Sequence, residues 1–443
     1  MDQPAPPDAR LERGGAAADD DPAREALLRE AETALRRLAP DLPPDATVLL
    51  RRLFADVPGP ELAGIPSETV AEAAASLYAF ARERPPGEAE LRVLPPGAGR
   101  GPHAVAEIVT DDMPFLVDSA LAALARQGRV VKQLLHPVVA VRRDAAGRLL
   151  SLGGAETDAT GRESMMRITI GAAQTAMLPG QGAGGWPELE RMLARAMADV
   201  RLAVTDFPAM SRLMRAAEDE IAAAPRERGP AAEFLRWLMD ENFVLLGHRR
   251  LDVGEGGAAA VAAGENLGLL RDPAVPVFDA LRDPSALPPA MRAALAEPVP
   301  LSVGKANMRS TVHRPQHADV VATRIFASDG RVAGLRLFLG LFAAGAYNRN
   351  PRSIPMLSQK VDRILAAAGF DPEAHDGRAL RNILDTWPRD ELFQAPEAEI
   401  LRGARVALDL QIRPRPALHV RRDPFGRFVS AIAWMPREGF DTR

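Results

Sequence analysis

The sequence predicts an α+β protein, because strand-like and helical stretches alternate along most of its 443 residues. From about residue 103 the pattern runs strand, helix, strand, strand, strand, helix. Short strands with two helices that return to one face of the sheet predict an antiparallel, ferredoxin-like layer. Hydrophobic residues make up 47% and charged residues 26%, a balance typical of soluble globular proteins with ample core material.

Five stretches are expected along the chain. Residues 1–22 are rich in proline, alanine, aspartate and glycine, which predicts a disordered tail. Residues 23–90 form a helical section, in which Pro22–Leu38 has one apolar face. The remaining stretches are 91–205 for the ferredoxin-like layer, 206–402 for a mixed α/β connecting region, and 403–443 for the start of a second layer.

Individual elements follow from apolar spacing and from turn residues. In the layer, strands are expected at His103–Val109, Val130–Arg142, Arg148–Leu152 and Ser164–Ile170, and helices at Pro114–Gln127 and Pro187–Ala224. In the connecting region, a helix at Ala231–Glu241 leads into a strand at Asn242–Val253. Asp329-Gly330 lies between two apolar runs and predicts a tight hairpin.

One motif occurs twice. Val141-Arg-Arg-Asp-Ala-Ala-Gly-Arg148 matches Val420-Arg-Arg-Asp-Pro-Phe-Gly-Arg427. The two copies are 279 residues apart, because 421 − 142 = 279. Aspartate can bond to nearby backbone and glycine can take a positive φ, so Asp-x-x-Gly closes a hairpin. The motif indicates either two unrelated hairpins or two copies of one module, the second of which is incomplete in this sequence.

Composition excludes several classes of function. The net charge of −4 and the pI of about 6.1 argue against a nucleic-acid-binding or membrane-binding surface, where a basic stripe would be expected. The absence of cysteine excludes disulfides and thiolate chemistry. The longest apolar run, Leu337–Ala346, is too short to span a bilayer, and the N-terminus does not resemble a secretory signal. We therefore expect a cytoplasmic protein.

The turn Asp111-Asp112-Met113-Pro114-Phe115 is the first candidate site. It joins an apolar strand to a helix, so free backbone N–H groups and a positive dipole end should lie at the turn. That geometry suits a small anionic ligand or an edge-to-edge partner. Asp111 and Asp112 could be paired acid–base carboxylates, or they could be turn and capping residues.

The second candidate is a polar cluster that contains Lys305, Asn307, Arg309, His313 and Arg314. It combines cations with amide and hydroxyl donors, as a carboxylate or phosphate site would. The alternatives are a loop that bonds to its own backbone and an ion-paired subunit contact.

Three other motifs carry no site. The run Gly180–Gly185 fits G-x-G-x-x-G, but no strand leads directly into it, so it is not a dinucleotide fingerprint. Gly304-Lys305 lacks the first glycine of a phosphate loop. His313 and His317 have metal-ligand spacing, but Pro315 lies between them and no carboxylate completes a set.

Several segments, taken as an ordered set, resemble one family, the large bacterial NAD-specific glutamate dehydrogenases, in their N-terminal region. The resemblance runs from about residue 25 to the last residue. The segments that carry it are Asp111-Asp-Met-Pro-Phe-Leu-Val-Asp-Ser119, His136-Pro-Val138, Lys305-Ala-Asn-Met-Arg-Ser-Thr-Val-His-Arg-Pro315, Phe338-Leu-Gly-Leu-Phe342, Arg389-Asp-Glu-Leu-Phe-Gln394 and Val420-Arg-Arg-Asp-Pro-Phe-Gly-Arg-Phe428.

The resemblance implies a longer parent polypeptide with ACT-like regulatory modules before its nicotinamide-binding domain. The parent would oxidise L-glutamate to 2-oxoglutarate and ammonia with NAD, whereas this segment would hold no catalytic, cofactor-binding or metal-binding residue. The implied partners are the downstream dehydrogenase domain, further copies of the chain and an amino-acid effector. The alternative is a stand-alone amino-acid-binding ACT protein.

ACT modules bind amino acids at the turn after the first strand, where D-x-P-G-L is usual. This chain has Asp112-Met113-Pro114-Phe115-Leu116, so phenylalanine replaces the glycine that would allow a ligand close to the backbone. The departure puts effector binding in doubt, and the module is then expected to serve oligomer contacts.

Overall fold

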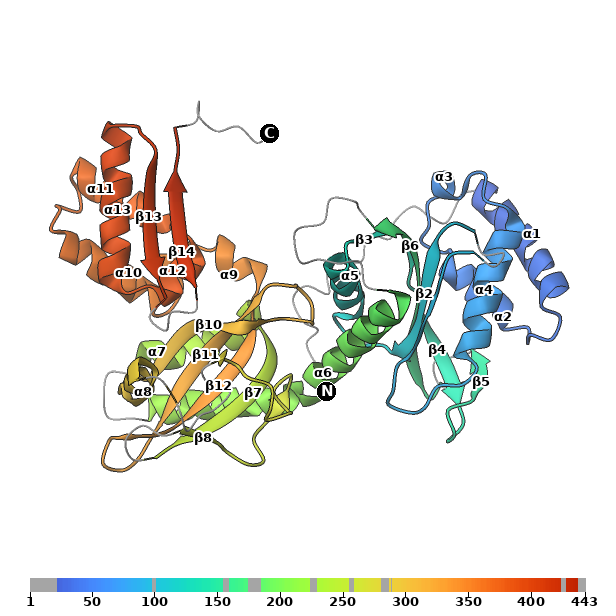
Figure 1. Ribbon diagram of the computed structural model, residues 1–443, viewed down its shortest axis with the longest axis horizontal. Coiled ribbons are helices and arrows are strands. Elements are labelled where there is room, and N and C mark those ends of the chain that lie inside the picture. The colour runs from blue at the N-terminus through green and yellow to red at the C-terminus, as the bar shows by residue number, and fades with distance from the viewer. Residues whose placement is uncertain are drawn as a thin grey trace. The chain divides into compact units, whose positions relative to one another are not determined.

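The computed structural model describes residues 22–97, 101–153, 159–173, 185–223, 229–254, 259–279, 287, 289–423 and 428–436. The chain divides into two compact units, which are described separately (Figure 1). Unit 1 contains the chain up to Arg201 together with Thr311–Pro315, and unit 2 contains Leu202–Ser310 and the chain from Gln316 onward. The expected tail at 1–22, apart from Pro22, and most of the glycine-rich run at 180–185 lie outside the described residues.

Unit 1 begins with four helices: α1 (Pro22–Leu38), α2 (Ala46–Leu53), α3 (Gly59–Leu62) and α4 (Ser67–Ala81). Helix α1 has the predicted bounds, because proline suits the first turn and the apolar residues recur on one face. That face buries Leu28, Ala31 and Leu35 against α2 and α4.

The sheet of unit 1 is antiparallel in every pairing among the described strands. Its strands are β1 (Glu90–Leu94), β2 (Ala104–Asp111), β3 (Arg129–Leu135), β4 (Val138–Arg143), β5 (Leu149–Leu152) and β6 (Gly161–Ala173), in the order β1-β2-β6-β4-β5, with β3 also on β6. Strands β3 and β4 follow each other along β6, because Leu135 faces Arg167 and Val138 faces Ser164. They correspond to the single predicted strand Val130–Arg142, interrupted at Pro137, which has no N–H to donate.

Helices cover both faces of this sheet (Figure 1). Helices α1–α4 pack on the face that carries Val109, Val139, Val141 and Met165. The opposite side holds α5 (Leu116–Arg126) and the first part of α6 (Trp186–Ala222). The boundary between the units falls inside α6, between Arg201 and Leu202.

A buried ion cluster lies within the sheet of unit 1. Glu107 on β2 has no exposed surface and binds Arg92 on β1 and Arg167 on β6. Arg92 also donates to the backbone oxygen of Ser76 on α4, at 3.1 Å. The strand β1 was not predicted from the sequence, but Arg92 links it both to its neighbour in the sheet and to the helical layer.

Unit 2 contains the rest of α6, α7 (Gly229–Trp237) and a second antiparallel sheet. Its strands are β7 (Phe243–Val253), β8 (Ala259–Val261), β9 (Leu267–Gly268), β10 (Leu301–Arg309), β11 (His317–Phe326) and β12 (Val332–Phe342), in the order β10-β11-β12-β7-β8, with β9 on β7 and helix α8 (Pro289–Ala296) between β9 and β10. The predicted hairpin is confirmed: Gly330 has φ +83°, and the Asp329 side chain accepts from the N–H of Arg331.

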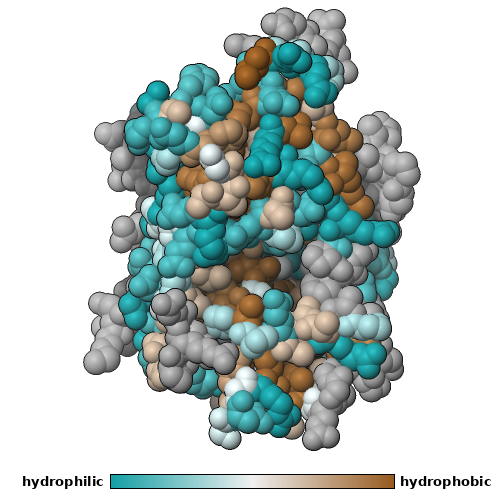
Figure 2. All heavy atoms as spheres, turned by 90° about the vertical axis from the view of Figure 1, so that its left-hand side faces the viewer, coloured by the Kyte–Doolittle hydropathy of each residue, from teal (hydrophilic) through white to brown (hydrophobic). Residues whose placement is uncertain are grey.

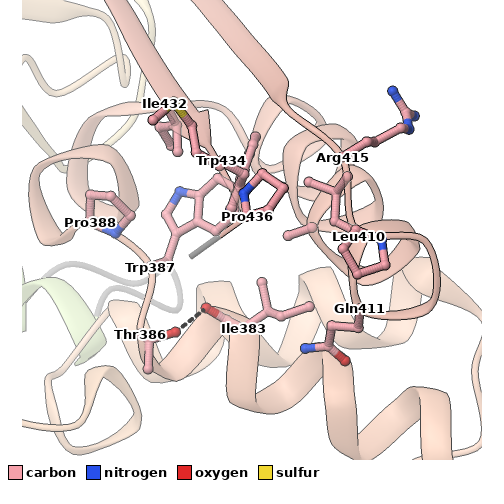
Figure 3. A pocket seen from close by; sticks show the side chains of 13 residues that line it. Ile383, Thr386, Trp387, Pro388, Leu410, Gln411, Arg415, Ile432, Trp434 and Pro436 are labelled. Carbon is pink, nitrogen blue, oxygen red and sulfur yellow. Dashed lines mark hydrogen bonds between the residues drawn. The ribbon is translucent and has the colours of Figure 1, made fainter. Parts of the chain in front are cut away.

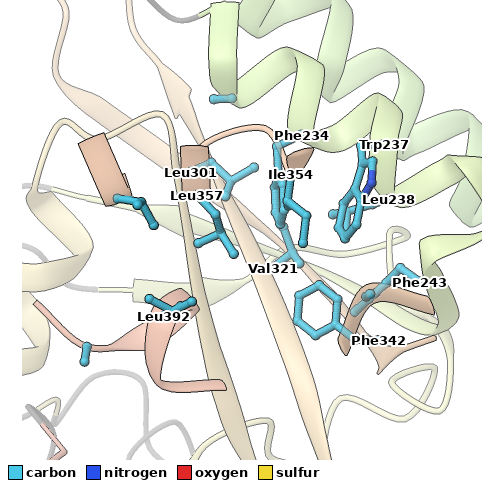
Figure 4. Close-up of a cluster of buried hydrophobic side chains, with 14 of the residues drawn as sticks. Phe234, Trp237, Leu238, Phe243, Leu301, Val321, Phe342, Ile354, Leu357 and Leu392 are labelled. Atoms are coloured by element: carbon cyan, nitrogen blue, oxygen red, sulfur yellow. The ribbon is translucent and has the colours of Figure 1, made fainter. Parts of the chain in front are cut away.

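The last part of unit 2 is helical and ends in a hairpin. It comprises α9 (Ala344–Asn348), α10 (Leu357–Ala368), α11 (His375–Asp385), α12 (Arg389–Gln394), α13 (Glu397–Ile412), β13 (Ala417–Arg422) and β14 (Val429–Trp434). The core joins these helices to α7 and to the second sheet (Figure 4). The rings of Phe342, a core residue, and Phe393, which packs against the core, stack with centroids 4.5 Å apart. No helix in the described part of the chain is long and apolar enough to cross a membrane.

Candidate functional site at the turn into helix α5

The turn between β2 and α5 has a strained backbone. Phe115 immediately precedes the helix with φ +72° and ψ 1°, in the left-handed region that bulky residues rarely enter. The helix was predicted to begin at Pro114 but begins at Leu116, because a left-handed residue cannot belong to a right-handed helix. Phe115 therefore keeps the backbone conformation that a glycine would adopt freely, although its side chain is a ring.

Asp111, at the end of β2, is held by two arginines of unit 1. Its Oδ1 accepts from Arg84 Nη2 at 2.6 Å, and its Oδ2 accepts from Arg201 Nη1 at 2.6 Å. Partial burial raises the pKa of Asp111, but the hydrogen bonds from Arg201 and Arg84 outweigh burial, and the pKa lies below its usual value. Arg84 also binds the buried carboxylate of Glu163, which Arg143 binds as well.

The next two residues of the turn are more open. The N–H of Asp112 donates to the carbonyl of Arg162 at 3.0 Å, and its exposed carboxylate lies 4.0 Å from the Arg162 side chain. Met113 is half-buried. Because Asp111 is bound by two cations and Asp112 is exposed, the two carboxylates lie in different environments.

A distant part of the sequence completes the surroundings of Phe115. The segment Thr311–Pro315 belongs to unit 1, although β10 and β11 on either side of it belong to unit 2. The ring of His313 lies 5.1 Å from the ring of Phe115, and His313 also has a positive φ, +63°. Two non-glycine residues in the left-handed region therefore pack on each other.

Hydrogen bonds fix this segment on the first turn of α5. The N–H of His313 donates to Ser119 Oγ at 3.0 Å, and Ser119 Oγ donates to the carbonyl of Phe115 at 2.6 Å. His313 Nδ1 lies 2.7 Å from Asp118 Oδ2. Thr311 Oγ1 donates to Asp199 on α6 at 2.6 Å. Asp118, Ser119 and Asp199 were not singled out from the sequence, because a separation of more than 100 residues gives no local pattern.

The polar cluster predicted at 305–314 is divided between the two units. His313 and Arg314 lie in unit 1, whereas Lys305, Asn307 and Arg309 lie on β10 in unit 2. Asn307 bonds to the neighbouring loop: its N–H donates to Val277 O, and its Oδ1 accepts from the N–H of Asp279. Arg309 is exposed and pairs with His317 in register.

Lys305 is part of a buried ion cluster in unit 2. Its Nζ lies 2.6 Å from Asp319 Oδ1 and 3.2 Å from Asp390 Oδ1. Asp319 has no exposed surface, and burial raises the pKa of this carboxyl to about 6, although Lys305 acts in the opposite direction. The N–H of Phe342 donates to Asp319 Oδ2, and Tyr347 donates to Asp390. Each carboxylate is thus held by several internal donors.

No group of three or more histidine, aspartate and glutamate side chains in the described residues is arranged to hold a metal ion.

Two family models match parts of this chain. The model for the glutamate dehydrogenase ACT1 domain matches residues 49–177, a range that runs from within α2 past the end of β6. The model for glutamate dehydrogenase helical motif 1 matches residues 354–413, which contain α10 to α13. The fold and the two matches together define a class: a protein with an ACT-like domain of the glutamate dehydrogenase type, followed by a helical motif.

Curated relatives point to one member of that class. The NAD-specific glutamate dehydrogenase of Halomonas elongata is 32% identical over 95% of this chain and 26% of its own length. The enzymes of the same name from Pseudomonas aeruginosa and Mycobacterium tuberculosis are 31% and 30% identical, over 83% and 82% of this chain. The chain is similar to the N-terminal part of the NAD-specific glutamate dehydrogenases, which confirms the resemblance. It spans about a quarter of the length of these relatives.

Proposed function

We propose that this chain is the regulatory and assembly region of an NAD-dependent glutamate dehydrogenase of amino-acid catabolism. The parent polypeptide would convert L-glutamate, NAD and water to 2-oxoglutarate, ammonia and NADH in the cytoplasm. The observation that carries the proposal is the match of 95% of this chain to about a quarter of a curated NAD-specific glutamate dehydrogenase. A dehydrogenase domain elsewhere in the parent would bind NAD, and this segment would bind no cofactor.

The internal bonding of the candidate residues supports a non-catalytic role for this segment. Asp111 has a lowered pKa and two arginine partners, so it is a poor proton donor or acceptor near neutral pH. Lys305 is held between Asp319 and Asp390. These groups stabilise strand ends and helix contacts through bonds that a substrate would have to displace.

An activity assay tests whether catalysis belongs to the dehydrogenase domain and not to this segment. The 443-residue chain should show no glutamate-dependent NAD reduction, whereas a polypeptide that continues into the dehydrogenase domain should show it. Turnover by the 443-residue chain would contradict the non-catalytic role. A reading frame that stops after Arg443 would instead favour the stand-alone ACT protein.

We propose a structural role for the turn at Asp111–Phe115. The Thr311–Pro315 segment lies on the first turn of α5, where the sequence pattern of ACT modules would put an amino acid. Titration calorimetry with a panel of amino acids should give no heat. Binding that Asp112→Ala abolishes would favour the amino-acid effector instead.

Assembly is the second part of the proposed role. Arg309 is exposed at the end of β10 and suits a contact with another copy of the chain. Arg309→Ala should lower the oligomer mass in light scattering, whereas Arg402→Ala, also exposed in unit 2, should leave it unchanged. An unchanged mass for Arg309→Ala would count against this contact.

The fold of unit 1 fits a ferredoxin-like layer with one rearrangement. Strand β2, helix α5, the strand pair β3–β4, strand β6 and helix α6 follow one another as in a ferredoxin-like layer, and the short strand β5 is inserted between β4 and β6. The place beside β2 that a last strand would take is occupied by β1, which comes first in the sequence. We propose that β1 replaces that last strand.

A further inference from the structure

The repeated motif forms two hairpins with the same strand register. In unit 1, Val141 faces Leu152 and Arg142 faces Ser151. In unit 2, Val420 faces Ala431 and Arg421 faces Ser430. Every one of these positions in unit 2 is 279 residues after its counterpart, so the sequence repeat extends to the pairing of β13 with β14. The turns differ by one residue, since Asp144 N–H bonds to Arg148 O and Asp423 N–H to Phe428 O.

Equivalent faces of the two hairpins differ in burial. Val139 and Val141 on β4 are each 3% exposed, because α1–α4 cover them. Their counterparts on β13, Leu418 and Val420, are 64% and 47% exposed. On β14, Val429 is also exposed. Figure 2 views the chain from the side on which α11 and α13 lie in Figure 1, and apolar side chains reach the surface among hydrophilic ones there as well. An apolar sheet face of this kind marks a binding surface.

The helices that precede this hairpin cover its other face. His419 and Arg421 on β13 are buried, and Arg421 binds Glu391 on α12 at 2.8 Å. Helix α13 approaches β13 closely at Gly403, where a Cβ atom would lie 3.0 Å from the ring of His419. The inner face of the hairpin is therefore in contact with helices α12 and α13, whereas the outer face is exposed.

Among the described residues, the edge of β13 has no counterpart of β6. In unit 1, β4 pairs with β5 on one side and with β6 on the other. In unit 2, the described residues give β13 only β14, and a two-stranded sheet is marginal in water. The offset of 279 places the counterpart of Gly161, the first residue of β6, at 440, after the last described residue, Pro436.

A cavity lies where the described chain ends. It has a volume of about 330 Å³ and is lined by Trp434, Met435 and Pro436, together with side chains of α11 and α13 such as Ile383 and Leu410 (Figure 3). Its lining is mainly apolar and it is small for a cofactor. One or two apolar side chains of a following segment would fill it.

We propose that a later segment of the same polypeptide binds the β13–β14 hairpin, with a strand on the free edge of β13 and a helix across Leu418, Val420 and Val429. The relatives are long enough to contain such a segment, because about three quarters of their length lies outside the part that this chain covers. This inference rests on the proposed function, since only the longer parent contains such a segment.

The absence of cysteine allows a direct test by single-cysteine labelling. Val420→Cys reports on the outer face, and Leu38→Cys on α1 is the matched control, because the two side chains are 47% and 45% exposed. Maleimide labelling rates are compared between the 443-residue chain and the parent-length polypeptide. In the parent, Val420→Cys should react on the order of tenfold more slowly, and Leu38→Cys at about the same rate.

Two outcomes overturn the inference. Equal rates for Val420→Cys in both polypeptides would show that no later segment covers the face. Protection already present in the 443-residue chain, and lost on dilution, would assign the face to a second copy. Glutamate-dependent NAD reduction by the same parent-length protein separates the two proposals: activity without protection contradicts only the docking surface, and protection without activity contradicts only the proposed function.

Discussion

Two carboxylates in this molecule have cationic partners but titrate in opposite directions. Asp111 in unit 1 has two arginines, keeps partial contact with solvent, and has a lowered pKa. Asp319 in unit 2 is fully buried, shares one lysine with Asp390, and has a pKa raised to about 6. The comparison shows that one shared cation does not offset complete burial, whereas two dedicated cations more than offset partial burial.

Removing the lysine should have the largest effect. Lys305→Ala leaves Asp319 buried without its cation, which should lower the free energy of unfolding by about 3–5 kcal/mol. Denaturant unfolding followed by tryptophan fluorescence measures the change, because Trp237, Trp387 and Trp434 all lie in unit 2. The control, Asp390→Asn, removes a carboxylate that is 42% exposed and should change stability by less than about 1 kcal/mol. Similar losses in the two variants would contradict the assigned importance of burial.

The pH dependence of stability extends the comparison, because unit 2 contains a second buried group, His248, whose pKa burial shifts in the opposite direction to that of Asp319. Burial lowers the pKa of His248 to about 4, so the stability it contributes is present above pH 6.5 and is lost as the pH falls toward 4. The raised pKa of Asp319 contributes stability below its unfolded value of 3.8 that is lost as the pH rises through about 6. Between pH 4 and 6 the two contributions oppose each other.

Single variants should separate the pH dependence of stability that comes from His248 from the one that comes from Asp319. Asp319→Asn should become less stable on acidification from pH 6.5 to 4, by on the order of 1–3 kcal/mol, because His248 then titrates unopposed. His248→Gln, which can still donate to the carbonyl of Glu265, should instead become more stable over the same interval. Unfolding midpoints in urea at several pH values would show this, and parallel curves for the two variants would refute it.

Sequence patterns predicted the features that depend on neighbouring residues. Helix Pro22–Leu38 and the hairpin at Asp329-Gly330 follow from local periodicity and turn chemistry, and both appear as expected. Strand β1 was missed because its five residues have no clear alternation of buried and exposed positions. The contact of His313 with Asp118 joins residues 195 positions apart, for which the sequence holds no local signal.

The candidate clusters show the same limit. Lys305 and His313 looked like parts of one polar site because they are close in the sequence, but they lie in different units. The sequence favours Asp111 as a candidate acid–base residue, but Arg84 and Arg201 bind its carboxylate. Neither arginine is near Asp111 in the sequence, so only the fold reveals that the carboxylate is already neutralised.

The arginine clamp on Asp111 should show a smaller effect than the buried lysine. Arg201→Ala removes bonds to Asp111 and Thr110 but leaves Arg84 in place, so a loss of roughly 1–2 kcal/mol is expected. Hydrogen exchange of β2 and β6, measured by mass spectrometry, reports on unit 1. Arg162→Ala is the control, because this side chain is 57% exposed and 4.0 Å from Asp112, and it should leave exchange unchanged. Faster exchange in both variants would mean that the clamp is not specific to Asp111.

The smallest effect concerns the backbone beside the same carboxylate. At φ +72°, position 115 should favour glycine, so Phe115→Gly should be more stable than Phe115→Ala by about 1 kcal/mol, although both lose the ring contact with His313. In a right-handed helix the order is reversed, and Ala122, inside α5, provides that reference: Ala122→Gly should be destabilising by about the same amount. Hydrogen exchange of α5 measures both comparisons. If alanine were the better residue at position 115, Phe115 would not hold the left-handed conformation in solution, and the packing of Thr311–Pro315 on the first turn of α5 would have to be revised.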